Sequence, residues 1–211
     1  MRPALPQRFS GEDGACGQGM IVVERAKRLI LNPRAEWEVV AAEPTTIGQI
    51  YAFYALPLAL IPAVAGFVGA SLVGMGVPGL GNFRVPLGLG LVSAVVQLGI
   101  GLALVYVLAM IVDGLAPTFG AEKNRTAAFK LVAYAYTPAW LAGIFNILPS
   151  ISFLTLLGLY SVYLLHVGLP RLMRVPPGRA APYTAVVVIA GIVLAVIVGG
   201  VLGLAFGRPM M

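Results

Sequence analysis

Charged residues are scarce in this sequence. They make up 10% of its 211 residues, whereas an ordinary soluble domain carries roughly 25%. So few charges cannot cover the surface of a water-soluble protein of this size, which excludes a soluble globular enzyme. The formal charge of +6 comes mostly from basic residues that lie between apolar segments. That placement favours contact with anionic lipid headgroups and argues against nucleic acid as a partner.

Residues that bind metals or catalyse reactions are also few. Cys16 is the only cysteine and His166 the only histidine, which excludes an intrachain disulfide, a cysteine metal cluster and a multi-histidine metal site. The sequence contains no dinucleotide-binding glycine motif, no P-loop lysine and no zinc-protease motif. The glycine-rich residues 74–81 are better explained as a hairpin loop. We therefore expect no catalytic residues, no cofactor and no metal, and a protein that is not an enzyme.

Apolar residues, in contrast, are abundant: they form 59% of the chain and gather in runs of about 20, the length that crosses the hydrocarbon core of a bilayer. This pattern predicts an all-α, polytopic membrane bundle occupying residues 49–207. Arginine outnumbers lysine, and alanine, glycine and proline are common, as in GC-rich bacterial genomes, so we expect a bacterial inner membrane. The predicted transmembrane helices are 51–73, 89–112, 127–148, 151–169 and 183–206.

Local signals mark the ends of these spans. Thr46 and Gln49 have the spacing of a capping box just before the first span. Pro57 and Pro62 lie inside that span, where each removes a backbone hydrogen bond and favours a kink. Pro149 and the residue after it leave room only for a tight turn, so the fourth span must return antiparallel to the third.

The N-terminal part divides into two segments. Residues 1–19 are polar and rich in proline and glycine, which predicts either a disordered tail or an extension upstream of a true start at Met20. Residues 20–48 read as two short amphipathic helices that meet at Asn32 and Pro33, an N-cap followed by a proline at the first helical position. A basic amphipathic segment with one tryptophan, Trp37, fits a helix on the cytoplasmic membrane surface; the alternative is a solvated linker.

Few polar side chains lie within the spans. Asp113 and Lys130 both lie at span ends, where they either pair and join the second span to the third or are separately solvated at the interface. His166 lies near the end of the fourth span. It is either a proton or cation group or an interfacial side chain bonded to a carbonyl or a lipid. Gln97 suits a hydrogen bond between helices.

Small residues recur at every fourth position of the fifth span. On a helix they form a continuous groove that another backbone can approach closely. We expect this stripe to face protein, either another span of the same chain or the fifth span of a second copy in a homo-oligomer. Its members are Gly191, Ala195, Gly199, Gly203 and Gly207.

Three segments together resemble a known family. The second span ends in Asp113-Gly-Leu-Ala-Pro117, the third contains Tyr134-Ala-Tyr136-Thr-Pro138-Ala-Trp140, and the fourth contains Tyr163-Leu-Leu-His166-Val-Gly-Leu-Pro170. With an amphipathic N-terminus and five spans, this chain resembles the bacterial branch of the Yip family over about residues 20–206. The resemblance implies a membrane architecture and makes these motif residues candidates for a functional site: Asp113, Pro117, Tyr134, Tyr136, Pro138, Tyr163 and His166.

The resemblance bears less directly on partners. Eukaryotic Yip proteins are named for interacting with Ypt/Rab GTPases, and their second span ends in Asp-Leu-Tyr-Gly-Pro. Only Asp113 and Pro117 match that motif here, so a GTPase partner is not expected. Our interpretation is a non-enzymatic inner-membrane protein that organises the lipid bilayer or other membrane proteins. The alternative is a small oligomeric transporter or channel, because broken helices with prolines often line binding sites.

Basic residues predict the orientation of the chain. Cytoplasmic loops of membrane proteins carry an excess of lysine and arginine. With five spans, the N-terminal segment shares one side with the second and fourth loops, and that side holds twelve basic residues against two, Arg84 and Arg208, on the other. The twelve are Arg2, Arg8, Arg25, Lys27, Arg28, Arg34, Lys123, Arg125, Lys130, Arg171, Arg174 and Arg179.

This orientation is tested with a topology reporter. A reporter fused after Pro177 is expected to be cytoplasmic and one fused at the C-terminus to be external, because the fifth span lies between the two fusion points. Activity of both fusions on the same side of the membrane would contradict the five-span topology.

Overall fold

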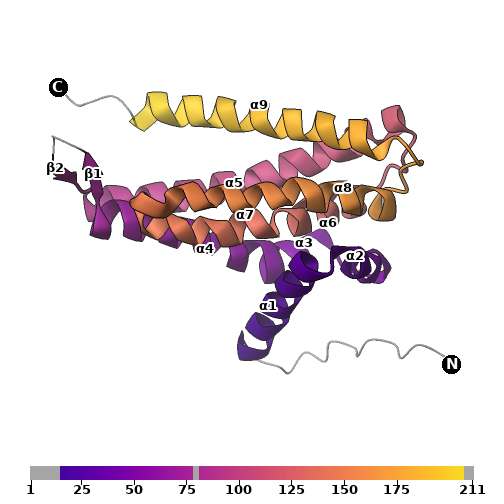
Figure 1. Ribbon diagram of the computed structural model, residues 1–211, viewed down its shortest axis with the longest axis horizontal. Coiled ribbons are helices and arrows are strands. Elements are labelled where there is room, and N and C mark those ends of the chain that lie inside the picture. The colour runs from indigo at the N-terminus through magenta and orange to yellow at the C-terminus, as the bar shows by residue number, and fades with distance from the viewer. Residues whose placement is uncertain (1–14, 78–80, 207–211) are drawn as a thin grey trace.

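The computed structural model describes residues 15–77 and 81–206, and nearly all of them are helical (Figure 1). Its first helix in the bundle is continuous over Ile47–Val73, and the helices that follow lie roughly parallel or antiparallel to it. The expected disordered segment falls mostly outside the described residues. The elements are α1 (Ala15–Leu31), α2 (Pro33–Ala42), α3 (Ile47–Ile50), η1 (Tyr51–Ala55), α4 (Leu56–Phe67), η2 (Val68–Val73), β1 (Met75–Val77), β2 (Gly81–Phe83), α5 (Leu87–Leu115), η3 (Ala116–Phe119), α6 (Arg125–Ala135), α7 (Thr137–Ala142), η4 (Gly143–Ile147), η5 (Pro149–Leu159), α8 (Tyr160–Leu172) and α9 (Ala180–Phe206).

Helices of this chain are long and apolar enough to cross a membrane. Within the described residues four meet both conditions: Ile47–Val73, Leu87–Phe119, Ser150–Leu172 and Ala180–Val201. A fifth segment, α6 through η4, is interrupted and packs between the others, against α5, α8 and the helix of the first span. The protein is thus an all-α membrane bundle of about five spans, and its helices cover the ranges expected from the sequence.

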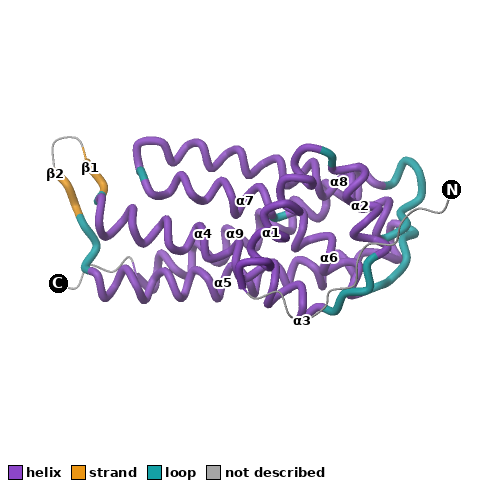
Figure 2. Tube along the Cα trace, turned by 90° about the horizontal axis from the view of Figure 1, so that it is seen from below, coloured by secondary structure: helices purple, strands orange, loops and turns teal. Residues whose placement is uncertain are grey.

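The two ends of the bundle differ (Figure 1). The antiparallel hairpin of β1 and β2 and the C-terminal end of α9 lie at one end, and the connections from α5 to α6 and from α8 to α9 lie at the other, close to α2. Figure 2 shows the tight turn that joins η4 to η5 at the same end as the hairpin. This alternation is what consecutive antiparallel spans require.

The first span begins as the sequence predicts. The Thr46 hydroxyl accepts a hydrogen bond from the Gln49 backbone N–H, and the Gln49 side chain accepts one from the Thr46 N–H at 3.0 Å, so the capping box is confirmed. Pro57 has no N–H to donate. Directly before it, the Leu56 N–H donates to the Tyr51 carbonyl five residues earlier. The chain therefore accommodates this proline with a π-helical stretch, η1.

The third segment breaks at Tyr136. α6 ends at Ala135 and α7 begins at Thr137, with Tyr136 at φ −74° and ψ −7° between them. Pro138 stands in the first turn of α7, where its missing N–H removes no helical hydrogen bond. The break therefore lies two residues before Pro138, one of the residues of the family-like motif. The part of the segment before the break lies in the core, since every residue from 128 to 135 is buried.

The N-terminal helices pack onto the bundle. Asn32 is the N-cap of α2 and Pro33 its first residue, as expected. Trp37 and Val40 are completely buried and belong to the same core as residues of α6 and α8, whereas Ala41 is exposed. The apolar face of α2 is therefore covered by protein, which differs from a helix whose apolar face lies in lipid.

Beyond Gly191, the described part of the stripe of small residues on α9 does not face another span of this chain. A Cβ added to Gly191 would lie 3.9 Å from Leu108, but one added to Gly199 or Gly203 would meet nothing within 4 Å, and Ala195 is exposed. The reason is that α9 is held through its first turns, where Tyr183 and Val187 are completely buried. The same-chain version of that expectation is wrong; contact with a second copy stays a prediction, and Gly207 lies outside the described residues.

Close helix contacts are made by other glycines. A Cβ on Gly69 would lie 2.1 Å from the Asn146 carbonyl oxygen, one on Gly143 2.5 Å from Pro62, and one on Gly168 2.5 Å from Leu131 and 2.8 Å from Trp37. Real side chains do not approach so closely. These three glycines therefore set the distance of the first span and of α2 from the middle of the bundle.

We expect Gly69→Ala to destabilise the protein by roughly 1–3 kcal/mol, the usual cost of overpacking, because its new methyl group collides with backbone that cannot move aside. Gly101→Ala is the matched control, since nothing lies within 4 Å of a Cβ there and alanine favours the helix interior. Thermal unfolding in detergent measures both. Equal melting temperatures for the two variants would contradict the close contact.

Candidate functional site

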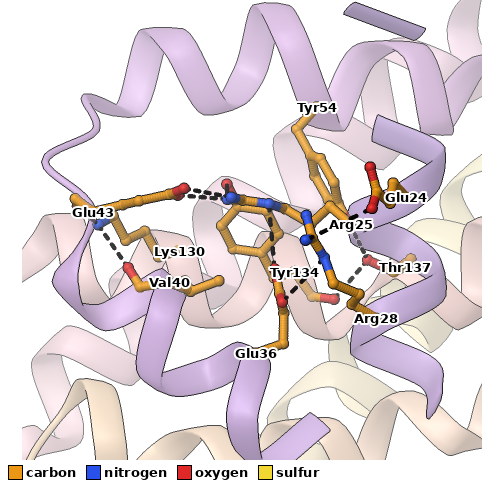
Figure 3. Close-up of polar contacts among 10 residues, drawn as sticks. All are labelled: Glu24, Arg25, Arg28, Glu36, Val40, Glu43, Tyr54, Lys130, Tyr134 and Thr137. Atoms are coloured by element: carbon orange, nitrogen blue, oxygen red, sulfur yellow. Dashed lines mark hydrogen bonds and ion pairs between the residues drawn. The ribbon is translucent and has the colours of Figure 1, made fainter. Parts of the chain in front are cut away.

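A cluster of charged side chains lies buried where α1 and α2 meet the bundle (Figure 3). Arg25 comes from α1, Glu36 from α2, Glu43 from the residue after α2, and Lys130 and Tyr134 from α6. Arg25, Glu36 and Lys130 are each less than a tenth exposed. Burying charges away from water is costly unless they are paired, so the partners of each group decide what the cluster does.

Arg25 is the centre of the cluster. Its two terminal nitrogens donate to both carboxylate oxygens of Glu43, one at 2.5 Å, in the bidentate arrangement that gives the strongest ion pairs. One of these nitrogens also donates to the Tyr134 hydroxyl at 3.2 Å, and the guanidinium lies 5.5 Å from the centre of the Tyr134 ring. Burial lowers the pKa of Arg25, but the hydrogen bond from Arg25 to Glu43, together with the electrostatic effects of Tyr134 and Glu43, outweighs it, so the net pKa is raised and Arg25 stays charged.

Lys130 holds the C-terminal end of α2. Its ammonium group donates to the Val40 carbonyl at 3.1 Å and to the Glu43 carbonyl. These carbonyls belong to the last turn of α2 and the residue that caps it, where a helix leaves acceptors unsatisfied and carries partial negative charge. One lysine therefore satisfies backbone acceptors that would otherwise be buried without a donor.

Glu36 joins the two N-terminal helices. Its carboxylate lies 3.6 Å from the Arg25 Nε and 3.4 Å from the Arg28 Nε. One of its oxygens, Oε1, is buried and has no hydrogen bond among the described residues. Glu36 is thus held by charge rather than by good hydrogen-bond geometry, and it depends on Arg25 and Arg28 remaining in place.

A chain of hydroxyl groups continues from the cluster into the bundle. The Tyr54 and Thr137 hydroxyls lie 2.7 Å apart, and Thr137 donates to the Tyr134 carbonyl at 2.7 Å. The Tyr54 and Tyr134 rings are in contact, with centres 4.4 Å apart. These contacts connect the first span to the break in the third segment, and they satisfy polar groups at that break.

Asp113 forms a second buried anionic site, at the end of α5. It is 1% exposed, and its Oδ2 lies 3.7 Å from the Arg125 Nε. Lys130 instead binds α2, so the first alternative drawn from the sequence, an Asp113–Lys130 pair, is wrong. Both side chains are buried, so the second alternative, separate solvation at the interface, is wrong as well. The reason is the direction of α6: Arg125 at its start reaches Asp113, while Lys130, more than one turn later, faces α2.

The rest of the Asp113 motif joins α5 to α9. Beside Asp113, the Tyr183 hydroxyl donates to the Val112 carbonyl. Pro117 lies in the first turn of η3, and the Phe119 ring of η3 stacks on Tyr183 with centres 4.6 Å apart. The motif at the end of the second span therefore contacts the chain's own fifth span.

The remaining candidate residues do not join the cluster. His166 is exposed, and its Nδ1 lies 3.2 Å from the Thr184 hydroxyl oxygen. Tyr163 is exposed beside Tyr160. Tyr136 is half-buried beside Trp140, and Pro138 is buried at the start of α7. Of the motif candidates, only Tyr134 contributes a side chain to the charged cluster.

Arg25, Glu36 and Glu43 were not singled out by the sequence. A signal for two of them exists, because Arg25 and the core residue Leu29 share a helix face, as do Glu36 and Val40. Opposite charges on the apolar faces of two consecutive helices indicate a buried ion pair. Among the described residues no group of three histidine, cysteine, aspartate or glutamate side chains has the arrangement of a metal site.

These features define a multi-pass membrane bundle whose N-terminal helices are fastened to it by buried ions. The chain belongs to the Yip1 domain family: the family model matches residues 27–198. It is 24% identical over 170 residues to Inner membrane protein YohC of Escherichia coli K12, covering 79% of this chain and 87% of that protein, and equally similar to YohC of Escherichia coli O6:H1. No solved structure matches the chain.

The cluster predicts a large cost for removing one charge. Arg25→Met leaves Glu43 without its main partner and Glu36 with Arg28 alone, so we expect a loss of roughly 3–5 kcal/mol, as for other broken buried ion pairs. Lys27→Met, two residues along α1 and exposed, is the control and is expected to change stability little. Unfolding in detergent measures both.

A third variant separates the ion pair from general damage to α1. Arg25→Met combined with Glu43→Met removes both charges, and we expect it to be more stable than Arg25→Met alone, because the uncompensated carboxylate is gone. A double variant that loses the sum of the two single losses would contradict the pairing.

Proposed function

We propose that this chain is a non-enzymatic scaffold of a bacterial inner membrane, which holds two amphipathic helices at the cytoplasmic surface and so organises lipids or partner proteins there. The observation that carries the proposal is the use of its buried charges. Arg25 pairs with the Glu43 carboxylate, and Lys130 binds the backbone carbonyls at the end of α2. They fasten one part of the chain to another, and this is the chemistry of an architectural element.

The places of the other polar side chains also support a scaffold over a transporter. A transporter directs its polar groups at a site between the helices. His166, which the sequence offers as a proton or cation group, is exposed, and so is Gln97. The broken third segment meets hydroxyl groups of its neighbours at its break, which gives the break a structural explanation.

The inner-membrane location is proposed from the similarity to YohC and the cytoplasmic N-terminus from the distribution of basic residues. Consistent with that orientation, α2 lies at the same end of the bundle as the connections from α5 to α6 and from α8 to α9 (Figure 1). Lipids, a second copy and another membrane protein are the proposed partners. Asp113 is buried, which supports an internal role for this motif residue rather than recognition of a GTPase.

A flux assay tests the scaffold against the transporter. In proteoliposomes that contain the purified protein, we expect proton, sodium and potassium flux no faster than in protein-free liposomes. Flux that exceeds the protein-free rate and falls in His166→Ala or Gln97→Ala would overturn the proposal.

Crosslinking in cells tests whether the N-terminal helices contact partner proteins. A photocrosslinking residue at Ala35, on the exposed face of α2, is expected to give discrete protein adducts, and one at the exposed Val95 of α5 to give lipid adducts. Arg25→Met should weaken the adducts at Ala35, because it releases the N-terminal helices. Adducts at Ala35 that do not depend on Arg25 would contradict the role of the cluster.

A further inference from the structure

An apolar groove runs between α1 and the first span. Its volume is about 630 Å³, within the range of roughly 300–1,000 Å³ typical of small-molecule sites. Val23 and Leu31 of α1 form part of one wall, and Phe53 and Pro57 part of the other. Val23, Leu31 and Phe53 are all more than half exposed, so the described residues of the chain leave both walls uncovered.

Small side chains keep the groove open. Ala26 on α1 and Ala52 on η1 line it from opposite sides, where longer side chains would close the space. α1 is fixed at this distance because Arg25, next to Ala26, is bound to Glu43 and Tyr134. The charged cluster thus holds one wall of the groove in place.

Lys27 is the one charged residue of the lining. Its neighbours on α1 are differently placed: Arg25 is paired with Glu43, and Arg28 lies within 4 Å of Glu24 and Glu36. For Lys27, no ion pair or hydrogen bond is found within the part of the chain that the structure describes. An apolar groove with one unpaired cation is complementary to a ligand with a long apolar part and one anionic group.

We propose that this groove binds an anionic phospholipid of the bilayer, with one acyl chain along the apolar walls and the phosphate at Lys27. An extended peptide fits less well, because the lining side chains offer only Lys27 to its backbone groups, and unpaired backbone groups are costly away from water. An acyl chain has no such groups. The inference deepens the scaffold proposal and rests on its placement of α1 at the membrane surface.

Two variants separate the headgroup from the chain. Lys27→Gln is expected to reduce the preference for phosphatidylglycerol over phosphatidylcholine by about fivefold, the effect of one lysine near an anionic surface. Ala52→Phe fills the groove and is expected to weaken both lipids by similar factors, leaving their ratio unchanged. Native mass spectrometry of the full chain, titrated with each lipid in detergent, measures the fraction of protein that retains one lipid.

Matched controls are available for both changes. Lys123→Gln removes an exposed lysine from the loop before α6, and Val95→Phe enlarges an exposed apolar side chain of α5; both are expected to retain lipid as the unchanged protein does. Thermal unfolding without added lipid shows that each variant is folded.

Three results would overturn the proposal: an unchanged lipid preference in Lys27→Gln, an unchanged affinity for both lipids in Ala52→Phe, or a dimer that disappears in Ala52→Phe, which would make a second copy the occupant. Each leaves the flux and crosslinking experiments on the scaffold unaffected. Conversely, ion flux with intact lipid selectivity would reject the scaffold and keep the lipid site.

Discussion

The structure depends on the pairing of Arg25 with Glu43. A guanidinium held away from water needs an anion and well-placed acceptors, and this chain supplies them from three separate segments. α1 can occupy its position only if α2 ends where Glu43 reaches Arg25. α2 in turn ends against Lys130, whose ammonium group binds the carbonyls of its last turn. One set of charges therefore fixes the order and spacing of α1, α2 and α6, and in a chain with so few charges there is little competition for these partners.

The broken third segment follows from the same constraint. A continuous helix through the middle of the bundle would satisfy its own backbone and need no polar neighbours. The break at Tyr136 interrupts the helical hydrogen bonds of the backbone. The Thr137 hydroxyl donates to the Tyr134 carbonyl beside the break, and the Tyr54 hydroxyl is hydrogen-bonded to Thr137. Because Tyr134 also contacts Arg25, the break and the charged cluster are parts of one network. This explains how Lys130, Tyr134 and Thr137 remain buried: each has a polar partner that a neighbouring element provides.

Much of the fold could be predicted from the sequence because spans, caps and turns are local properties. Runs of apolar residues mark the spans, and Thr46 with Gln49 marks the start of the first one. Partners of side chains are not local. Asp113 lies at the end of the second span and Lys130 near the start of the third. In the structure, however, Arg125 at the start of α6 pairs with Asp113, and Lys130 contacts α2 instead.

Close packing at glycines likewise depends on neighbouring helices and could not be predicted from spacing alone. The regular stripe on α9 is exposed at Gly199, whereas Gly69 and Gly168, which belong to no complete stripe, touch backbone or core side chains. Spacing along one helix shows which small residues share a face, but only the neighbouring helix decides whether that face is used.

Polar contacts are concentrated at one end of the molecule. Besides the charged cluster, Asp113 binds Arg125, Tyr183 binds the Val112 carbonyl, and the Glu122 N–H donates to the Met173 carbonyl at 3.0 Å. All these residues lie in or beside the connections at the end of the bundle near α2 (Figure 1). Toward the other end, α9 presents Ile192, Val196 and Ile197 as exposed side chains, and hydrophobicity gives no drive to pair such a surface with another helix in lipid. Because regions with few buried contacts open at lower free energy, motion of α9 is least restrained at the end that carries its glycines. The polar end is the more strongly restrained one, and α2 packs beside it.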